Sequence, residues 1–497
     1  MLFKKAIVKF LAKQNKKKVD RWSKSSLLNQ KKIFQKHMKI LPKTAFGKSI
    51  GAKKNMTIGD FREVCPINSY ENISDFVDRI AKGEKNVLWL GKLLYFAKTS
   101  GTTSGTKYIP LTKEMLRHQI NASKEALLLY AYDNNKYDHI NGKMMFVQGS
   151  PVLKKHKKIY TGRLSGIVAH HIPYFLKSNR LPSMKTNSIK IWEKKLEKMV
   201  EETINADLRL IGGIPPWVIM YFQKIFKKSK QKSHLKIFPN LSLYVHGGVG
   251  FQPYKNTLKS LLPGVDFLEY YPASEGFIGY QDDIKKDELL LLTNHGIFYE
   301  FIKVIDFING NHNRITLDEV ILEENYVLIL STCSGLWSYN IGDTVKFVNL
   351  SPYRIVVTGR VNHFISAFGE HVIGKEVDSA LDSGLKNFGG KVFGFTVCPN
   401  IKPKKGLPHH EWFVEFIEKP ENISGFCDHL DGCVRKQNIY YNDLIKSLVI
   451  QPLVVNCVKV GSFNKYMSSI GKLGGQNKCP SLSNDRKIGD YLKNYIE

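Results

Sequence analysis

A run of hydroxyl, glycine and lysine residues between Thr99 and Pro110 is the part of the sequence with the clearest chemistry. Six Ser or Thr residues, two Gly and one Lys fill the positions from Thr99 to Lys107. Glycines let backbone N–H groups approach a phosphate, hydroxyls donate to its oxygens, and a lysine supplies positive charge. The spacing differs from the Walker pattern, in which a lysine directly follows the second glycine. The run predicts either a polyphosphate-binding loop or an ordinary polar surface loop.

Two later segments favour the first interpretation. Tyr270 to Gly276 reads Tyr-Tyr-Pro-Ala-Ser-Glu-Gly, and Tyr339 to Val345 reads Tyr-Asn-Ile-Gly-Asp-Thr-Val. The hydroxyl-rich run resembles the phosphate loop of adenylate-forming enzymes, including its spacing from Thr102 to the lysine. The later segments resemble that superfamily's Tyr-Gly-x-Thr-Glu and Tyr-x-x-Gly-Asp motifs. All three occur in the expected order, so the sequence favours an adenylating enzyme.

Regular elements must hold these motifs in place. The apolar residues 93–97 predict a strand before the hydroxyl-rich run, and a helical pattern follows Thr112, which is a suitable N-cap. Strands alternate with helices as far as residue 250, which indicates an α/β fold. Residues 288–332 are rich in strands and predict a sheet or barrel-like subregion of the same large domain.

The pattern restarts after Arg360 with a predicted helix over 375–385 and strands over 392–398, 412–418 and 453–460. We therefore expect an N-terminal adenylation domain over residues 1–362 and a smaller, mobile α+β domain over residues 363–497.

The N-terminal segment is strongly basic. Residues 1–18 contain seven lysines and no acidic residue. An apolar stretch interrupted by Lys9 and followed by no small-residue cleavage site predicts an amphipathic helix rather than a targeting signal. Helix continues over 20–40, with a buried face predicted from its apolar residues: Leu27, Leu28, Ile33, Phe34 and Met38.

The composition limits the class of protein. The net charge is +30, but only 12 of the 74 basic residues are arginine, and the lysines are spread along the chain. This distribution argues against a specific nucleic-acid surface, although non-specific adhesion to nucleic acid remains an alternative. No apolar run approaches the roughly 20 residues of a membrane span.

Cysteine usage indicates the compartment. The seven cysteines are an odd number without a disulfide framework, so we expect a reducing compartment, the cytoplasm. Cys427, His429 and Cys433 have the spacing of half a zinc site, but no second pair follows, and a structural site wants four ligands.

Six further segments make the resemblance closer than superfamily level. They are Thr44 to Gly47, Pro66 to Tyr70, Ile214 to Trp217, Ala273 to Gly276, Gly296 to Phe301 and Gly474 to Lys478. Over about residues 27–490 the chain resembles the Gretchen Hagen-3 family of acyl-acid amido synthetases, and within it the bacterial branch. The resemblance implies that ATP and a carboxylic acid form an acyl-adenylate, which an amine, in plant members an amino acid, then converts to an amide.

The resemblance also implies roles for individual residues. Those that match the nucleotide-binding positions are Ser100, Gly101, Thr102, Thr103, Lys107, Tyr271, Ala273, Ser274, Asp343 and Arg360. Among them, Tyr271 is expected beside adenine, and Asp343 is expected to accept both ribose hydroxyls, which needs two acceptor oxygens. Glu275 matches the acid associated with Mg²⁺, a hard cation suited to oxygen ligands. Lys478 matches a C-terminal lysine that reaches the phosphates, and we expect it to act with Glu275 in catalysis.

Each of these residues has an ordinary structural alternative. Glu275 could be a helix-start acid, Asp343 a turn residue, and Arg360 a salt-bridge partner. Lys478 could be a surface lysine. Three departures from the family pattern bear on the function: Asn340 in place of Arg in the third motif, Cys479 to Ser481 after Lys478, and a loosely matching segment over residues 438–446.

The leading hypothesis is an ATP- and Mg²⁺-dependent ligase that joins a small carboxylic acid to an amine, with an amino acid as the expected acceptor. An acid–thiol ligase that uses coenzyme A as acceptor is the alternative within enzymes. The departures at Ser481 and residues 438–446 motivate a third possibility, a nucleotide-binding protein that has lost turnover.

Overall fold

The computed structural model describes residues 2–100, 106–172, 178–361, 364–365, 367–368, 370, 372–473, 479–483 and 485–497. The chain divides into two units. The first comprises Met1–Gly213, Phe238–Gly248 and Asp266–Val356, and the second comprises Ile214–Ile237, Val249–Val265 and Val357–Glu497. The predicted domain boundary at residues 362 and 363 lies outside the described residues and stays a prediction.

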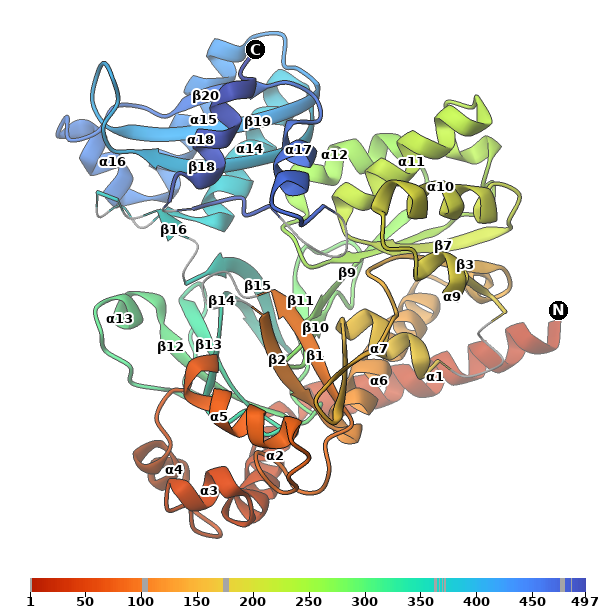
Figure 1. Cartoon of the computed structure of the whole chain (residues 1–497), viewed down its shortest axis with the longest axis vertical. Helices are drawn as coiled ribbons and strands as arrows, with labels where there is room; N and C mark the ends of the chain where they lie inside the picture. Colours follow the sequence, from red (N-terminus) through yellow and green to blue (C-terminus); the bar gives the residue numbers. More distant parts are fainter. Residues whose placement is uncertain are drawn as a thin grey trace. The chain divides into compact units, whose positions relative to one another are not determined.

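An eleven-stranded sheet forms the centre of the first unit (Figure 1). The strands follow in the order β12 (Ile297–Lys303), β13 (Asn325–Thr332), β14 (Tyr339–Leu350), β15 (Tyr353–Arg360), β11 (Leu289–Leu291), β10 (Phe277–Tyr280), β9 (Asp266–Pro272), β8 (Leu243–Gly247), β7 (Leu208–Gly213), β3 (Lys143–Val147) and β6 (Arg180–Leu181). Strands β9, β8, β7, β3 and β6 are parallel. The neighbouring pairs β9–β10, β10–β11, β11–β15, β12–β13 and β13–β14 are antiparallel. The α/β prediction is confirmed, and the β-rich stretch is the antiparallel part of the same sheet.

A second sheet carries the hydroxyl-rich run. Its order is β2 (Thr106–Leu111), β1 (Tyr95–Ser100), β5 (Ile159–Gly162) and β4 (Lys154–His156). The predicted strand before the run is present. At the end of the run, Thr106 to Pro110 pair with β1, whereas residues 101–105 lie outside the described residues. Pro110 is tolerated there because β2 is an edge strand.

The helices of the first unit are α1 (Leu2–Lys24), α2 (Ser26–Ile40), α3 (Ala45–Ser49), α4 (Ile58–Val64), α5 (Tyr70–Ala81), α6 (Lys113–Asp133), α7 (Leu164–His170), α9 (Met184–Asn187), α10 (Trp192–Thr203) and α13 (Val304–Ile308). The predicted cap of α6 is confirmed, since the Thr112 hydroxyl accepts a hydrogen bond from the Met115 N–H at 3.1 Å. Helix α1 packs along α6 (Figure 1).

The predicted buried face of α2 is partly wrong. Leu27 and Leu28 are 47% and 51% exposed, whereas Phe34 and Met38 are buried as expected. Gln30 is buried instead, because its amide donates to the carbonyls of Thr293 and Ile297 and accepts from the Tyr299 N–H. A polar side chain satisfied by main-chain groups therefore turns this face of the helix inward.

The second unit contains the helices α11 (Pro215–Ser229), α12 (Gln252–Leu261), α14 (Gly374–Phe388), α15 (Ile423–Gln437), α16 (Ile439–Lys446), α17 (Ser462–Ser469) and α18 (Lys487–Leu492). Its strands are β16 (Phe364–Ile365), β17 (Val372–Ile373), β18 (Lys391–Asn400), β19 (His409–Glu418) and β20 (Val454–Val458). Trp412 on β19 and Phe426 on α15 belong to its buried core. The helix and strands predicted after Arg360 are all present.

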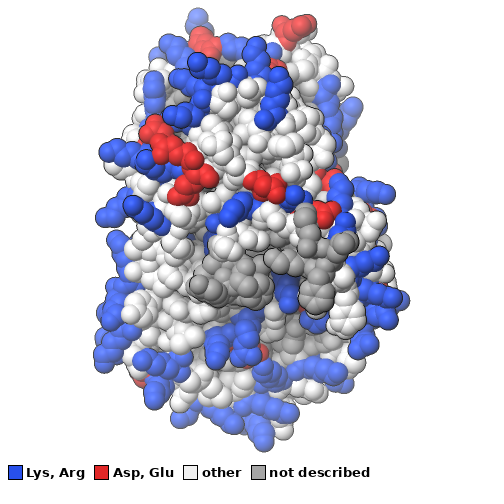
Figure 2. Space-filling view, turned by 90° about the vertical axis from the view of Figure 1, so that its right-hand side faces the viewer, with Lys and Arg blue, Asp and Glu red and all other residues white. Residues whose placement is uncertain are grey.

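Lysine and arginine side chains are scattered over the face seen in Figure 2, with a few acidic groups between them. No helix within the described ranges is both long enough and apolar enough to cross a membrane. All seven cysteines lie in these ranges as free thiols.

Candidate active site

A direct hydrogen bond joins the second motif, Tyr270 to Gly276, to the third motif, Tyr339 to Val345. The hydroxyl of Tyr271 on β9 donates to Oδ2 of Asp343 on β14, with the two oxygens 2.7 Å apart. Both residues are partly exposed. An aromatic ring and a carboxylate from strands that are distant in sequence therefore lie side by side.

A bulge in β14 positions Asp343. Val327 on β13 pairs with Thr344, and Ile329 pairs with Asn340, so that Leu328 lies opposite the three residues 341–343. Gly342 has a φ of 81°, a conformation that glycine adopts without strain. The Asn340 side chain accepts from the Gly342 N–H at 2.7 Å. The asparagine that departs from the family pattern thus stabilises the bulge.

The turn from Ala273 to Gly276 joins β9 to β10. The Ala273 N–H donates to the Gly276 carbonyl at 2.9 Å, and the Gln119 amide donates to the Ala273 carbonyl at 2.9 Å. Ser274 and Glu275 are partly exposed in this turn. Gln119 lies on the buried side of α6. Our sequence analysis missed this residue, although a glutamine on an apolar helix face was a usable signal.

The described part of the hydroxyl-rich run includes Lys107 and the backbone of Ser100. Lys107 lies on β2 opposite Thr99, and its ammonium is 5.6 Å from the centre of the Tyr70 ring. Gly101, Thr102 and Thr103 lie outside the described residues, as does Lys478. Their predicted roles remain predictions.

A short segment connects the first and third motifs. Asn68 pairs with β14, since its N–H donates to the Ser338 carbonyl and its carbonyl accepts from the Asn340 N–H, both at 2.9 Å. Two residues later, the Tyr70 hydroxyl accepts from the Tyr108 N–H on β2 at 3.0 Å. The sequence around Asn68 and Tyr70 does not indicate this connection, because neither partner is near in sequence.

A buried ionic network supports the same segment. Arg314 donates to the carbonyls of Arg62 and Cys65, at 2.9 and 3.0 Å, and to the Ser338 hydroxyl. Glu300, which is 1% exposed, accepts from Arg62 at 2.8 Å and forms an ion pair with Arg314 at 3.5 Å. The two arginines and the carboxylate together hold the chain just before Asn68 against β14.

Arg360 is the last residue of β15 and is exposed. It belongs to the second unit, whereas Tyr271 and Asp343 belong to the first.

Known protein families match nearly the whole chain. The GH3 family N-terminal domain matches residues 16–189 and 146–267, the central domain matches 290–360, and the C-terminal domain matches 375–487. This chain belongs to the GH3 family. The resemblance to this family is confirmed, while the bacterial branch stays a prediction, and the chain is a ligase that forms carbon–nitrogen bonds through an acyl-adenylate.

Two plant relatives are similar over different shares of their length. Jasmonoyl–L-amino acid synthetase JAR6 of Nicotiana attenuata is 22% identical over 492 residues, which cover 84% of this chain and 83% of the relative. Indole-3-acetic acid-amido synthetase GH3.10 of Arabidopsis thaliana is 23% identical over 285 residues, covering 52% of this chain and 47% of the relative.

Solved structures share the fold. GH3.15 acyl acid amido synthetase matches with a TM-score of 0.80 at 14% identity, over 99% of this chain and 96% of that protein. A 2-hydroxyisobutyryl-CoA ligase in the postadenylation state matches with a TM-score of 0.59 at 13% identity, over 90% of this chain and 86% of that protein. The fold is thus that of adenylating enzymes.

Proposed function

We propose that the chain is an ATP-dependent acyl-acid amido synthetase that activates a small carboxylic acid and transfers its acyl group to an amino acid. The contact between Tyr271 and Asp343 carries this proposal, because it joins two motifs into one surface suited to a nucleoside. The ring offers a face for stacking with adenine, and the carboxylate offers acceptors for ribose hydroxyls.

In the first step, a carboxylate oxygen of the acid attacks the α-phosphorus of ATP, and the bond to the departing pyrophosphate breaks. We assign the phosphates to Ser100, Gly101, Thr102, Thr103 and Lys107. Positive charge and N–H donors held in place stabilise the charge that develops on pyrophosphate. Arg360 and Lys478 are the proposed additional cations.

The side-chain oxygens of the second motif, from Ser274 and Glu275, are suitable ligands for a magnesium ion. Glu275 is partly exposed in the tight turn after β9, and Ser274 precedes it in the sequence. Carboxylate and hydroxyl oxygens are the hard ligands that Mg²⁺ prefers. When bound, the ion would neutralise phosphate charge, and the chain's part is to hold the Glu275 carboxylate in the turn that Gln119 fixes.

In the second step, the amine nitrogen attacks the acyl carbon of the adenylate. The bond from that carbon to the phosphate oxygen breaks, AMP leaves, and the amine releases a proton to solvent. The name of JAR6 as an amino acid synthetase favours an amino acid as the acceptor, and the name of GH3.10 as an amido synthetase favours an amide product.

Carboxylate-dependent ATP–pyrophosphate exchange tests the proposal. We would screen aryl, indole, jasmonate-like and fatty acids with Mg²⁺, and then supply the twenty amino acids or coenzyme A to the acid that supports exchange. Asp343→Ala and Glu275→Gln should each lower exchange on the order of 100-fold. Glu193→Gln, which changes an exposed carboxylate on α10, is the control.

An amide product would support the proposal, and a thioester formed only with coenzyme A would overturn the choice of acceptor. ATP binding without exchange for any acid would instead indicate a nucleotide-binding protein that has lost turnover.

A further inference from the structure

Three side chains outside the nucleotide motifs bring metal-binding atoms together. Glu114 and His118 lie one turn apart on α6, and Cys333 follows β13. Their ligand atoms all lie within 4.8 Å of one another, and His118 Nε2 is 3.9 Å from Glu114 Oε1. All three residues belong to the first unit.

Gly296 leaves room for this convergence. A Cβ at Gly296 would lie 2.7 Å from Cys333 Sγ and 3.0 Å from His118 Nε2. The same imidazole nitrogen therefore faces both the sulfur and the carboxylate. In a Cys–His–Glu proton relay, one imidazole nitrogen would contact the sulfur and the other nitrogen would contact the carboxylate. Because a single nitrogen faces both groups here, the three side chains suit a shared cation better than an activated nucleophile.

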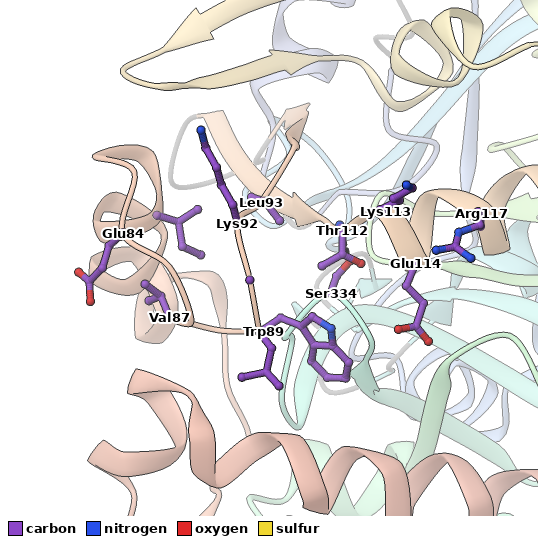
Figure 3. A pocket seen from close by; sticks show the side chains of 13 residues that line it. Glu84, Val87, Trp89, Lys92, Leu93, Thr112, Lys113, Glu114, Arg117 and Ser334 are labelled. Carbon is purple, nitrogen blue, oxygen red and sulfur yellow. Dashed lines mark hydrogen bonds between the residues drawn. The ribbon is translucent and has the colours of Figure 1, made fainter.

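The cluster is closed on one side and accessible on the other. Cys333 is fully buried, whereas the side chains of Glu114 and His118 are 32% and 25% exposed. Glu114 also lines a pocket of about 250 Å³ together with Trp89, Thr112 and Ser334 (Figure 3). An ion can enter from this pocket, and water can complete its coordination there.

Lys36 on α2 forms an ion pair with Glu114 Oε1. This ammonium neutralises the carboxylate when no other cation is bound. A divalent ion at the cluster competes with Lys36 for the carboxylate, so the lysine sets the affinity of the site without being a ligand. The Lys36 side chain is 51% exposed and can move into solvent.

We propose that Glu114, His118 and Cys333 form a binding site for Zn²⁺ or a chemically similar transition-metal ion. Thiolate and imidazole ligands select such ions over Mg²⁺ and Ca²⁺. Three protein ligands leave a fourth position of the tetrahedron open toward the pocket. On binding, a sulfur–metal bond forms, the thiol proton passes to solvent, and the Lys36 ammonium leaves Glu114.

The test uses Co²⁺ as a spectroscopic probe and excess Mg²⁺ to occupy sites made only of oxygen ligands. The full-length protein should bind one equivalent of Co²⁺ with sulfur-to-cobalt charge-transfer absorption, and Zn²⁺ should displace it. Cys333→Ser should abolish this absorption, and His118→Gln should weaken binding at least on the order of 100-fold.

Cys433→Ser is the matched control. Cys433 also lies close to a histidine, with its sulfur 3.4 Å from the His429 ring nitrogen, so it offers a second Cys–His pair to a metal ion. Absorption lost in Cys433→Ser and kept in Cys333→Ser would overturn the proposal, as would the absence of any thiolate–cobalt absorption in the unaltered protein.

Lys36→Met separates metal binding from a general loss of structure. This variant removes a competing cation at an exposed position, so Zn²⁺ affinity should rise about fivefold, the equivalent of a surface ion pair of about 1 kcal/mol. Zn²⁺ should also raise the thermal midpoint of the unaltered protein and of Lys36→Met, but not that of Cys333→Ser. Weaker Zn²⁺ binding in Lys36→Met would contradict a site centred on Glu114.

Discussion

The hydroxyl of Tyr271 donates to Asp343 Oδ2 at 2.7 Å, across a separation of 72 residues in the sequence. This bond orients the Asp343 carboxylate within the first unit. A carboxylate has two acceptor oxygens, so Asp343 can accept both from Tyr271 and from the ribose hydroxyls that we propose it binds.

Tyr271→Phe keeps the ring and removes this bond. We expect KM for ATP to rise about fivefold, which corresponds to about 1 kcal/mol for an orienting hydrogen bond, with little change in kcat. ATP–pyrophosphate exchange at varied ATP concentration measures this. Asp343→Asn, which removes the charge that the ribose hydroxyls face, should be much more severe. Equal effects of the two substitutions would contradict the proposed division of roles.

Tyr70→Phe tests the connection between the first and third motifs. The substitution leaves the Tyr108 N–H on β2 without its acceptor, while a ring remains beneath Lys107. An N–H without its acceptor costs about 1–3 kcal/mol, so adenylation should fall several-fold with only a small drop in thermal midpoint. Tyr495→Phe also keeps a ring near a lysine, Lys465, but in the second unit, and its exchange rate should be unchanged.

Glu300→Gln tests the buried network. The carboxylate is 1% exposed and faces both Arg62 and Arg314. Removing its charge leaves two arginines uncompensated, so the free energy of unfolding should fall by about 3 kcal/mol. Differential scanning calorimetry would record this as a lower unfolding midpoint.

The control for Glu300→Gln is Glu201→Gln, which breaks the exposed pair between Lys198 and Glu201. Its unfolding midpoint should not move, because solvent screens that pair. A comparable loss of stability in both variants would show that burial of the Glu300 network is not the cause.

His37 makes stability depend on pH. Its ring is 1% exposed between Trp89 and Trp337, neither nitrogen has a hydrogen-bond partner within the described chain, and burial lowers its pKa from 6.5 to about 3. The folded state thus binds fewer protons than the unfolded state below pH 6.5. Stability from this group is fully present above pH 6.5 and is lost as the pH falls toward 3.

His37→Phe should therefore be more acid-stable. At 1.36 kcal/mol per unit, the unaltered protein should lose about 2 kcal/mol between pH 8 and pH 5 through this histidine alone. Urea unfolding of both proteins at the two pH values would give the difference directly. Parallel pH profiles of the two proteins would show that the imidazole is charged and compensated in the folded state.

Local signals in the sequence predicted the elements well. Thr112 caps α6, and the apolar residues 93–97 predicted the strand that is present as β1. The order of the motifs also indicated the family, and through it predicted that Tyr271 and Asp343 bind the nucleotide. These features depend on neighbours within one or two turns or on short motifs, so a single sequence contains them.

The connections between elements were not predictable in this way. Leu27 and Leu28 are apolar and exposed, while Gln30 is buried by partners near residues 293–299. Gln119 and Asn68 likewise acquire their roles from main-chain groups far along the chain. Nothing in the residues around a polar side chain reveals which distant carbonyl will accept from it.

The pairing of Asn68 with Ser338 and Asn340 also constrains how the chain is made. Synthesis at 5–20 residues per second delivers β14 roughly 15–50 s after Asn68 leaves the peptidyl-transferase centre. During that interval the β12–β14 strands that pack against this region are not yet made, so the apolar side chains of α2 stay uncovered. The first hundred residues are therefore synthesised early but complete their native packing late.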